Sequence, residues 1–209
     1  MAAPVTSLAG PATGTVVLVG PAATGKSTLG ELVAAGLHKP FVDVDEVGWP
    51  YYAETGWTLE RLVDRISAVG RVAAEHEWEP ARAHATERVL ADHPGAVIAL
   101  GAGHTSYTDP ALARRVQATL AQIPEVVLVL PSQDPQRSVA VLRERSVEAK
   151  GTDWIREGHD FLADWVAEPL NRVVATSVLY TDGLTPEQAA GSIVSDVARH
   201  AGQARPSTR

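Results

Sequence analysis

A phosphate-binding pattern lies close to the N-terminus: residues 20–27 are GPAATGKS, which matches G-x-x-x-x-G-K-[ST]. The apolar run TVVLV precedes the pattern and the helical run TLGELVAAGL follows it, as the pattern requires. In such a loop successive N–H groups point at phosphate oxygens, and the N-terminus of the following helix adds partial positive charge. Because the spacing and both flanks agree, this interpretation is stronger than the alternative, a glycine-rich turn with a solvated lysine.

The pattern predicts binding of Mg·ATP. Lys26 is placed to bridge the β- and γ-phosphates, and the Ser27 hydroxyl is placed to bind Mg²⁺. The other expected nucleotide contacts belong to the same segment: Gly20, Ala22, Ala23, Thr24, Gly25 and Thr28. A motif of this kind indicates nucleotide binding and does not separate a kinase from an NTPase.

Two carboxylates, Asp43 and Asp45, end a second apolar segment at residues 40–44. If this segment is a strand, side chains two positions apart point the same way, so both carboxylates are expected at one spot. Beside a phosphate loop, we predict that Asp43 holds water on the Mg²⁺ shell and that Asp45 accepts a proton from an attacking hydroxyl. Without that loop, an acidic turn that caps the next segment is the better interpretation of the pair.

A third apolar segment, residues 96–100, continues into Gly101-Ala102-Gly103-His104. Small residues at a strand end allow the backbone to approach a ligand closely, although a tight strand exit explains them equally well. His104 stands alone among apolar and small residues, and we expect it on the polar surface.

A parallel sheet is needed to bring these segments together. Five short apolar or β-branched runs are expected strands: 15–20, 40–44, 96–101, 125–130 and 177–181. Helical periodicity alternates with them at residues 26–37, 58–69, 81–91, 110–122, 134–145, 153–175 and 185–200, and the pattern leaves open whether 153–175 is one helix or two. Strand, crossover helix and strand repeat, which predicts an α/β fold with ligands bound beyond the carboxyl ends of the strands.

Composition limits the class of protein. The chain has 209 residues, 45% of them hydrophobic, which suits one compact domain. It has no cysteine, so any metal must have oxygen or imidazole ligands, and a net charge of -7 argues against nucleic acid as a partner. No apolar run approaches the roughly 20 residues of a membrane span, and the first residues lack a signal-peptide pattern. We expect a cytoplasmic protein, monomer or homodimer, without a membrane partner.

Taken in order, these motifs resemble shikimate kinase and its neighbours in the nucleoside monophosphate kinase group. The resemblance covers residues 16–194: the phosphate loop, FVDVDEV, TLERL after Gly56, VIALGAG, an arginine-bearing region and EPLNRVVA. The phosphate loop specifies only the superfamily, whereas FVDVD and VIALGAG specify the branch. The resemblance implies a P-loop three-layer fold with a five-stranded parallel sheet. It also implies a single kinase domain at residues 15–202, with a substrate-binding helical insert at about 46–80, a mobile lid at about 143–158, and flexible ends at 1–14 and 203–209.

The resemblance also implies a function and roles for individual residues. The chain is expected to be an ATP- and Mg²⁺-dependent kinase that phosphorylates a hydroxyl of a small molecule. By matching position, the catalytic residues are Lys26, Asp45, Arg143 and Arg145, of which either arginine reaches the phosphates when the lid closes. Lid arginines stabilise charge that spreads over the transferring phosphoryl group. Ser27 and Asp43 are expected at the metal, Arg137 near adenine, and residues 101–103 against the acceptor.

Three departures from the family pattern concern the acceptor. A Phe-Arg-x-x-Glu segment, whose arginine holds the shikimate carboxylate, is replaced by Trp78-Glu79-Pro80-Ala81-Arg82, so arginine and glutamate are exchanged. A second carboxylate-binding arginine, which stands before Pro-Leu, is replaced by Glu168. The Gly-Gly-Gly turn has become Gly101-Ala102-Gly103, whose methyl group is expected to narrow the backbone approach.

These departures predict a changed acceptor. Loss of one partner of a buried ion pair costs roughly 3–5 kcal/mol, and Glu79 in the arginine's place adds repulsion. Together with the acidic residues Asp160, Asp164 and Glu168, this favours a hydroxylated acceptor that is neutral or carries an amine or guanidine. The expected acceptor contacts are Asp45, Trp78, Glu79, Arg82, Gly101, Ala102 and Gly103.

Two alternatives remain open. The chain is a true shikimate kinase with an unusual pocket if Arg82 binds the carboxylate after all. It is a nucleotide-binding regulator or resistance protein if the phosphate loop serves no turnover. Tryptophans 49, 57, 78, 154 and 165 are each expected in core or hinge packing, although their clustering favours a ring-shaped acceptor.

Overall fold

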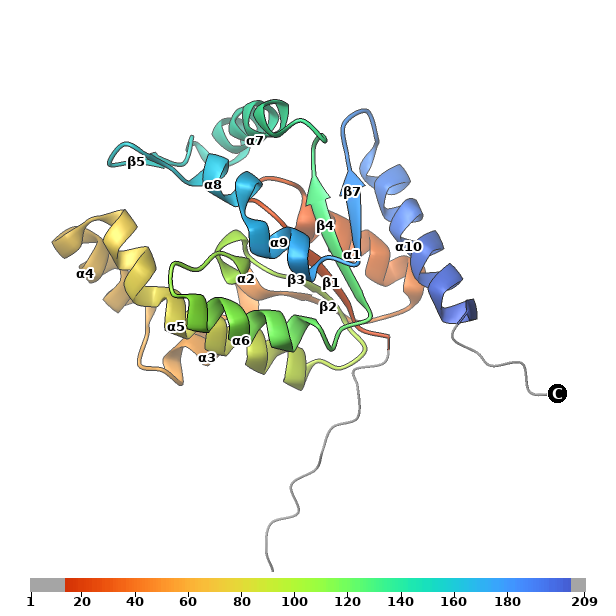
Figure 1. The fold of residues 1–209 in the computed structure, drawn as a ribbon, viewed down its shortest axis with the longest axis horizontal. Helices are drawn as coiled ribbons and strands as arrows, with labels where there is room; N and C mark the ends of the chain where they lie inside the picture. The colour runs from red at the N-terminus through yellow and green to blue at the C-terminus, as the bar shows by residue number, and fades with distance from the viewer. Residues whose placement is uncertain (1–13, 204–209) are drawn as a thin grey trace, which may run out of the picture.

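Five parallel strands form the central sheet of the computed structural model, which describes residues 14–203. The strands are β1 Val16–Val19, β2 Phe41–Asp43, β3 Val97–Ala99, β4 Glu125–Leu130 and β7 Ser177–Tyr180, in the order β2-β3-β1-β4-β7 (Figure 1). Each strand lies within a run predicted from the sequence, so the predicted five-stranded parallel sheet is confirmed. The predicted flexible ends lie, but for residues 14 and 203, outside the described residues.

Helices cover both faces of the sheet (Figure 1). Helices α1 Lys26–Leu37 and α10 Pro186–Gln203 pack on one face, and α5 Arg71–Asp92, α6 Pro110–Leu120 and α9 Pro169–Val174 pack on the other. Side chains of β1 alternate between the two cores, with Val16 and Leu18 toward α1 and α10 and with Val17 and Val19 toward the opposite layer. The strands are therefore apolar throughout because both of their faces are buried.

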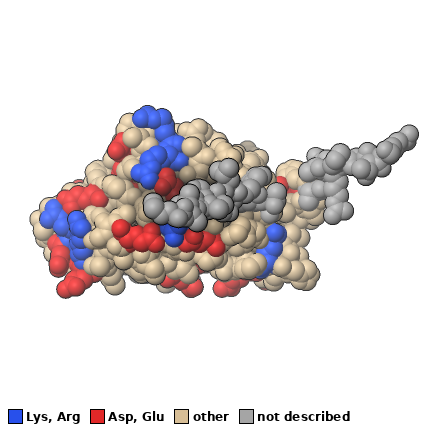
Figure 2. Space-filling view, turned by 90° about the horizontal axis from the view of Figure 1, so that it is seen from below, with Lys and Arg blue, Asp and Glu red and all other residues tan. Residues whose placement is uncertain are grey.

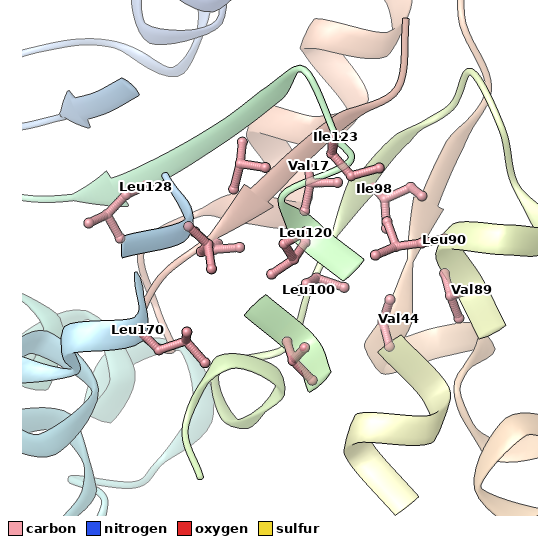
Figure 3. Close-up of a cluster of buried hydrophobic side chains, with 14 of the residues drawn as sticks. Val17, Val44, Val89, Leu90, Ile98, Leu100, Leu120, Ile123, Leu128 and Leu170 are labelled. Carbon is pink, nitrogen blue, oxygen red and sulfur yellow. The ribbon is translucent and has the colours of Figure 1, made fainter. Parts of the chain in front are cut away.

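The larger core lies between the sheet and α5, α6 and α9. Figure 3 shows Val17, Ile98 and Leu128 of the strands in one cluster with Leu90 and Leu120 of the helices. These side chains are at most 4% exposed, and burial of such a side chain contributes about 1.5–3 kcal/mol. This core fixes the sheet, and the sheet fixes the loops at its carboxyl edge.

A helical insert follows β2 and has a small core of its own. It contains α2 Val44–Val47, α3 Trp49–Ala53, α4 Leu59–Val69 and the first half of α5, which share a cluster around Tyr52, Trp57 and Leu62. The sequence predicted α5 only from residue 81. The helix begins ten residues earlier, at Arg71, and contains Pro80. Proline removes one helical hydrogen bond, but buried side chains on both sides of it, Ala74 and Ala81, hold the helix against the insert core.

The segment between α7 and β7 differs from the prediction. Helix α7 spans Pro135–Lys150, and it is followed by a hairpin of β5 Ile155–Arg156 and β6 His159–Asp160 and then by α8 Phe161–Ala167. The expectation of helix from residue 153 is therefore wrong for the hairpin, because Glu157 and Gly158 have positive φ values of 55° and 78°. The rest of the stretch forms two helices, α8 and α9. That residues 143–158 move as a lid stays a prediction.

Charge on the molecular surface is mixed. Lys and Arg side chains stand among Asp and Glu side chains on the face that Figure 2 shows, so the described residues form no continuous basic field there. Within residues 14–203, no helix combines the length and apolar character that crossing a bilayer requires.

Candidate active site

A cavity of about 470 Å³ lies at the carboxyl edge of the sheet, where β1, β2 and β3 end. Most residues that the sequence singled out line it: Ala22, Ala23, Thr24, Gly25, Lys26, Ser27, Thr28, Asp43, Asp45, Trp78, Arg82, Gly101, Ala102, Gly103 and Arg145. Gly20, Glu79, Arg137 and Arg143 do not line it. The fold thus brings the phosphate loop, the Asp43 and Asp45 carboxylates and the glycine turn to one place.

The phosphate loop has the conformation that an anion site needs. Gly20, Ala23 and Gly25 have φ values of 132°, 61° and 85°, and a Cβ atom on Gly20 would lie 2.5 Å from the carbonyl oxygen of Val129. No side chain caps the N-terminus of α1, so the N–H groups of its first turn remain for phosphate oxygens.

Lys26 is buried inside this loop. Its Nζ atom donates hydrogen bonds to the carbonyl oxygens of Gly20 at 2.8 Å and Pro21 at 2.7 Å. Burial lowers the pKa of Lys26 to about 8, although the nearby Asp45 raises it. A bound phosphate would favour the charged ammonium, so this lysine is suited to compensate phosphate charge.

The Asp43 and Asp45 carboxylates meet for a reason other than the one predicted. The strand ends at Asp43, and α2 begins at the next residue, so the two side chains are not alternate positions of one strand. Instead, Asp43 caps α2, and its Oδ1 atom accepts a hydrogen bond from the backbone N–H of Asp45 at 2.9 Å. Both residues line the cavity, with Asp43 buried and Asp45 exposed to it.

The donor set of this region fits Mg²⁺ held jointly with a nucleotide. Ser27, Asp43 and Asp45 offer only oxygen ligands to the cavity. The described residues contain no group of three or more His, Asp or Glu side chains that would enclose a metal by themselves. Mg²⁺ commonly binds through one or two carboxylates together with substrate phosphates and water.

One face of α5 forms the wall opposite the phosphate loop. Arg71, Glu75, Trp78 and Arg82 line the cavity at spacings of four, three and four residues, which place side chains on one side of a helix. Glu75 pairs through one carboxylate oxygen with Arg71 and through the other with Arg82. Within the described residues, the buried Nε1 of Trp78 and Nε of Arg82 have no hydrogen-bond partner. This wall therefore carries one excess positive charge.

The prediction that Glu79 faces the acceptor is wrong. Its side chain is 3% exposed and turns away from the cavity toward the segment before α6. There it accepts hydrogen bonds from the backbone N–H of Thr108 at 2.8 Å, from the Thr108 hydroxyl at 2.8 Å and from the N–H of Asp109 at 3.1 Å. Glu79 is one position, or about 100°, around the helix from Trp78, and this rotation removes it from the cavity face.

The other acidic residues invoked for a cationic acceptor are also engaged elsewhere. Asp160 pairs with Arg143, and Asp164 pairs with His159 at 2.9 Å. Glu168 caps α9 by accepting from the N–H of Leu170 at 3.0 Å. None of the three lines the cavity.

Each glycine of the turn after β3 stands against a side chain of the site. A Cβ atom on Gly101 would lie 2.4 Å from Oδ1 of Asp45, and one on Gly103 would lie 3.2 Å from the guanidinium carbon of Arg82. The methyl group of Ala102 packs against a cluster around Leu142 and Trp165. The substitution of the middle glycine thus adds contact with that cluster.

His104 is a residue of the site, and the prediction that it lies on the polar surface is wrong. It is 3% exposed, lines the cavity, and its Nε2 atom lies 2.7 Å from the Tyr52 hydroxyl. Burial lowers the pKa of His104 to about 3 and raises the pKa of Tyr52, so the tyrosine donates and the neutral imidazole accepts. The second nitrogen, Nδ1, faces the carbonyl oxygen of Gly101 at 3.3 Å. His104 therefore links the insert to the glycine turn.

This burial predicts a pH-dependent stability. Because the pKa of His104 is about 3 in the folded protein and about 6.5 in an unfolded chain, only the unfolded chain takes up a proton between these values. The contribution of neutral His104 to the free energy of unfolding is therefore fully present above pH 6.5. It is lost as the pH falls from 6.5 toward 3, by at most about 1.4 kcal/mol per pH unit.

Denaturant unfolding at several pH values tests this expectation. His104→Gln should flatten the decline of the free energy of unfolding below pH 6.5. His76→Gln, which changes an exposed histidine of α5, should leave the decline unchanged. An unchanged slope in His104→Gln would contradict the buried neutral state.

The predicted lid arginines differ in position. Arg145 lines the cavity, whereas Arg143 forms an ion pair with Asp160. Arg137 also lies outside the cavity, where its Nε donates to Asp182 at 2.7 Å. Its predicted place near adenine stays a prediction.

Other lining residues were not assigned from the sequence. Arg71, Glu75, His104 and Lys150 join the cavity. Arg71 and Glu75 share the helical spacing of Trp78 and Arg82, a signal that a correct start of α5 would have shown. Of the tryptophans, Trp78, Trp154 and Trp165 line the cavity, and Trp49 and Trp57 pack in the insert core.

Known proteins resemble this chain along most of its length. A shikimate kinase from Saccharopolyspora erythraea is 31% identical over 188 residues, which cover 87% of this chain and 92% of that protein. A shikimate kinase from Streptomyces coelicolor is 30% identical over 180 residues, which cover 83% and 89%. No protein-family model matches the chain.

Solved structures share the fold. The shikimate kinase from Acinetobacter baumannii in complex with shikimate has a TM-score of 0.63 at 19% identity and covers 89% of this chain and 93% of its own. The shikimate kinase from Aquifex aeolicus has a TM-score of 0.55 at 18% identity and covers 90% and 98%. The relatives identified by sequence and those identified by structure therefore agree on one family.

Proposed function

Because the chain belongs to the shikimate kinase family, we propose that it transfers the γ-phosphoryl group of ATP to a hydroxyl of a small molecule that carries an anionic group. Membership of this family makes the chain an ATP-dependent small-molecule kinase that acts on a hydroxylated molecule. The observation that carries the finer proposal is the glycine turn, which touches Asp45 with Gly101 and Arg82 with Gly103. An acceptor lying on this turn is within reach of both side chains.

The phosphate loop holds the nucleotide in this proposal. The N–H groups of the loop and of the first turn of α1 bind the phosphates, and Lys26 compensates their charge. Ser27 and Asp43 would hold Mg²⁺, which when bound neutralises charge on the β- and γ-phosphates. Arg145, which lines the same cavity, stabilises in this proposal the negative charge that spreads during transfer.

Asp45 acts on the acceptor. Its carboxylate is exposed to the cavity beside the glycine turn, where it accepts the proton of the attacking hydroxyl. As the bond from the hydroxyl oxygen to the γ-phosphorus forms, the bond from that phosphorus to the bridging oxygen breaks and ADP leaves. Asp43 is less suited to this role, because it is buried and its Oδ1 atom accepts the N–H of Asp45.

The charge of the α5 wall favours an anionic acceptor. Glu75 compensates one of the two arginines and leaves one positive charge facing a cavity in which Arg82 is 5% exposed. A carboxylate would compensate this charge, because hydrogen bonds between a guanidinium and a carboxylate are charge-assisted. With Glu79 turned away, the main reason for a neutral or cationic acceptor is removed.

A neutral hydroxylated acceptor is the second candidate. One reason is Glu168, which stands where the resemblance expects a second carboxylate-binding arginine. The other is that Arg71 and Arg82 are both already paired with Glu75. The aromatic rings of Trp78, Trp154 and Trp165 give such an acceptor a surface to stack on.

An ATP-consumption screen of the purified chain separates these candidates. Shikimate and other cyclic hydroxy acids, neutral polyols and amino sugars are supplied one at a time. We expect turnover with hydroxy acids at least about tenfold above that with uncharged analogues of the same ring, since a charge-assisted contact is worth roughly 1.5–3 kcal/mol. Turnover confined to polyols or amino sugars would overturn the anionic acceptor, and ATP binding without turnover on any acceptor would support a regulator.

A further inference from the structure

The tip of the β5–β6 hairpin carries an unusual residue. Glu157 and Gly158 are the two residues between the strands, and both have positive φ values, 55° and 78°. Two-residue hairpin turns of this kind favour Asn, Asp or Gly at the first position, because other side chains are strained there. A glutamate at that position therefore calls for a compensating interaction.

The interaction is with the N-terminus of α5. The Oε1 atom of Glu157 accepts a hydrogen bond from the N–H of Arg71 at 2.7 Å, and Oε2 lies 3.4 Å from the N–H of Val72. The residue before the helix, Gly70, offers no side-chain cap, and a Cβ atom there would lie 2.6 Å from Oε1 of Glu157. Gly70 thus leaves room for a cap that comes from another segment, 86 positions away in the sequence.

The capped first turn of α5 continues into the α5 wall of the cavity, which is called the acceptor wall below because the proposed acceptor lies against it. Arg71 donates its backbone N–H to Glu157 and pairs through its side chain with Glu75, which pairs in turn with Arg82. Apolar contacts join the same parts, because Val72 and Ala102 pack against the cluster of Leu142 and Trp165. In Figure 1 the hairpin projects from α7 and α8 on the side where α4 and the start of α5 lie.

We propose that Glu157 is a positioning residue, which caps α5 from the hairpin and so holds Arg71, Glu75 and Arg82 in register for the acceptor. This inference rests on the proposed function for its effect on the acceptor, but the cap itself is independent of which acceptor binds.

The first test measures hydrogen exchange at the amides of Arg71 and Val72 by NMR, with and without a non-hydrolysable ATP analogue. Glu157→Asn suits the turn conformation but is too short to reach α5, so the hairpin is kept and the cap is lost. We expect exchange at both amides to be about fivefold to tenfold faster in the variant than in the wild type, with or without the analogue, as for the loss of one helix cap. Equal exchange in both proteins would overturn the inference, whatever the acceptor.

The second test measures steady-state kinetics with the acceptor found in the screen. In Glu157→Asn the KM for the acceptor should rise about fivefold to tenfold while the KM for ATP changes less than about twofold, since a cap is lost only at the acceptor wall. Glu157→Gln keeps one accepting oxygen, so its KM for the acceptor should lie between those of the wild type and Glu157→Asn. Glu148→Ala, which removes an exposed glutamate of α7, should match the wild type. A purely structural role would instead lower kcat and thermal stability together and leave the acceptor KM unchanged.

Discussion

Asp45→Asn is expected to lower kcat by about 10²–10⁴-fold while the affinity for ATP stays within about twofold, because only proton transfer from the acceptor is lost. Asparagine has nearly the same volume as aspartate, so contact with Gly101 is kept. The backbone N–H that bonds to Asp43 is also unchanged. The variant therefore removes a charge and a proton acceptor with little change of structure.

The measurement combines a coupled assay of ADP release with calorimetric titration of ATP. Glu46→Gln is the matched control, since Glu46 is an exposed carboxylate in the same short helix that does not line the cavity. The control should retain both turnover and ATP affinity. Turnover of Asp45→Asn within a few-fold of the wild type would exclude Asp45 as the base, and a regulator would show no turnover to lose.

The parts of the site that come from short sequence separations could be predicted from the sequence. The loop at residues 20–27 sits between one strand and one helix, and its conformation depends on glycines at fixed places in the pattern. The five strands were visible because burial on both faces makes their centres apolar. Even the meeting of Asp43 and Asp45 was foreseen, although a helix cap and not strand alternation produces it.

The acceptor wall could not be predicted because it depends on the rotation of α5. A helix turns about 100° per residue, so a resemblance in sequence can identify the right segment and still assign the wrong face. Glu79 and Arg82 were both placed at the acceptor, and only Arg82 faces the cavity. The packing of Ala74 and Ala81 into the insert core sets this rotation, and such long-range packing leaves no local pattern.

The burial of His104 also could not be predicted from the sequence. A lone histidine in a sequence is usually a polar surface residue, and its burial here depends on Tyr52, which lies 52 positions earlier. A hydrogen-bond partner at that separation is brought close only by the fold. The Glu157 cap on α5 has the same character, with a separation of 86 positions.

Arg82→Met is expected to raise the KM for an anionic acceptor about 100-fold, which corresponds to roughly 3 kcal/mol for a buried charge that loses its partner. The KM for ATP should stay within about twofold, because Arg82 lies on the α5 wall and not at the phosphate loop. A neutral analogue of the same ring should lose little affinity. Arg82→Lys keeps the charge but not the planar fork, so it should lose about tenfold.

This substitution also leaves Glu75 with one arginine instead of two, so part of its effect comes from the carboxylate oxygen of Glu75 that loses its partner. The double variant Glu75→Gln/Arg82→Met removes both charges and separates the two contributions. We expect the double variant to recover part of the free energy of unfolding lost in Arg82→Met, because the side-chain oxygen that Arg82 had bonded is then uncharged. The acceptor KM should remain high, since the cation that holds the anionic group is still missing. Recovery of the KM together with stability would show that Arg82 supports the helix and does not bind the acceptor, and the neutral acceptor would then be the better proposal.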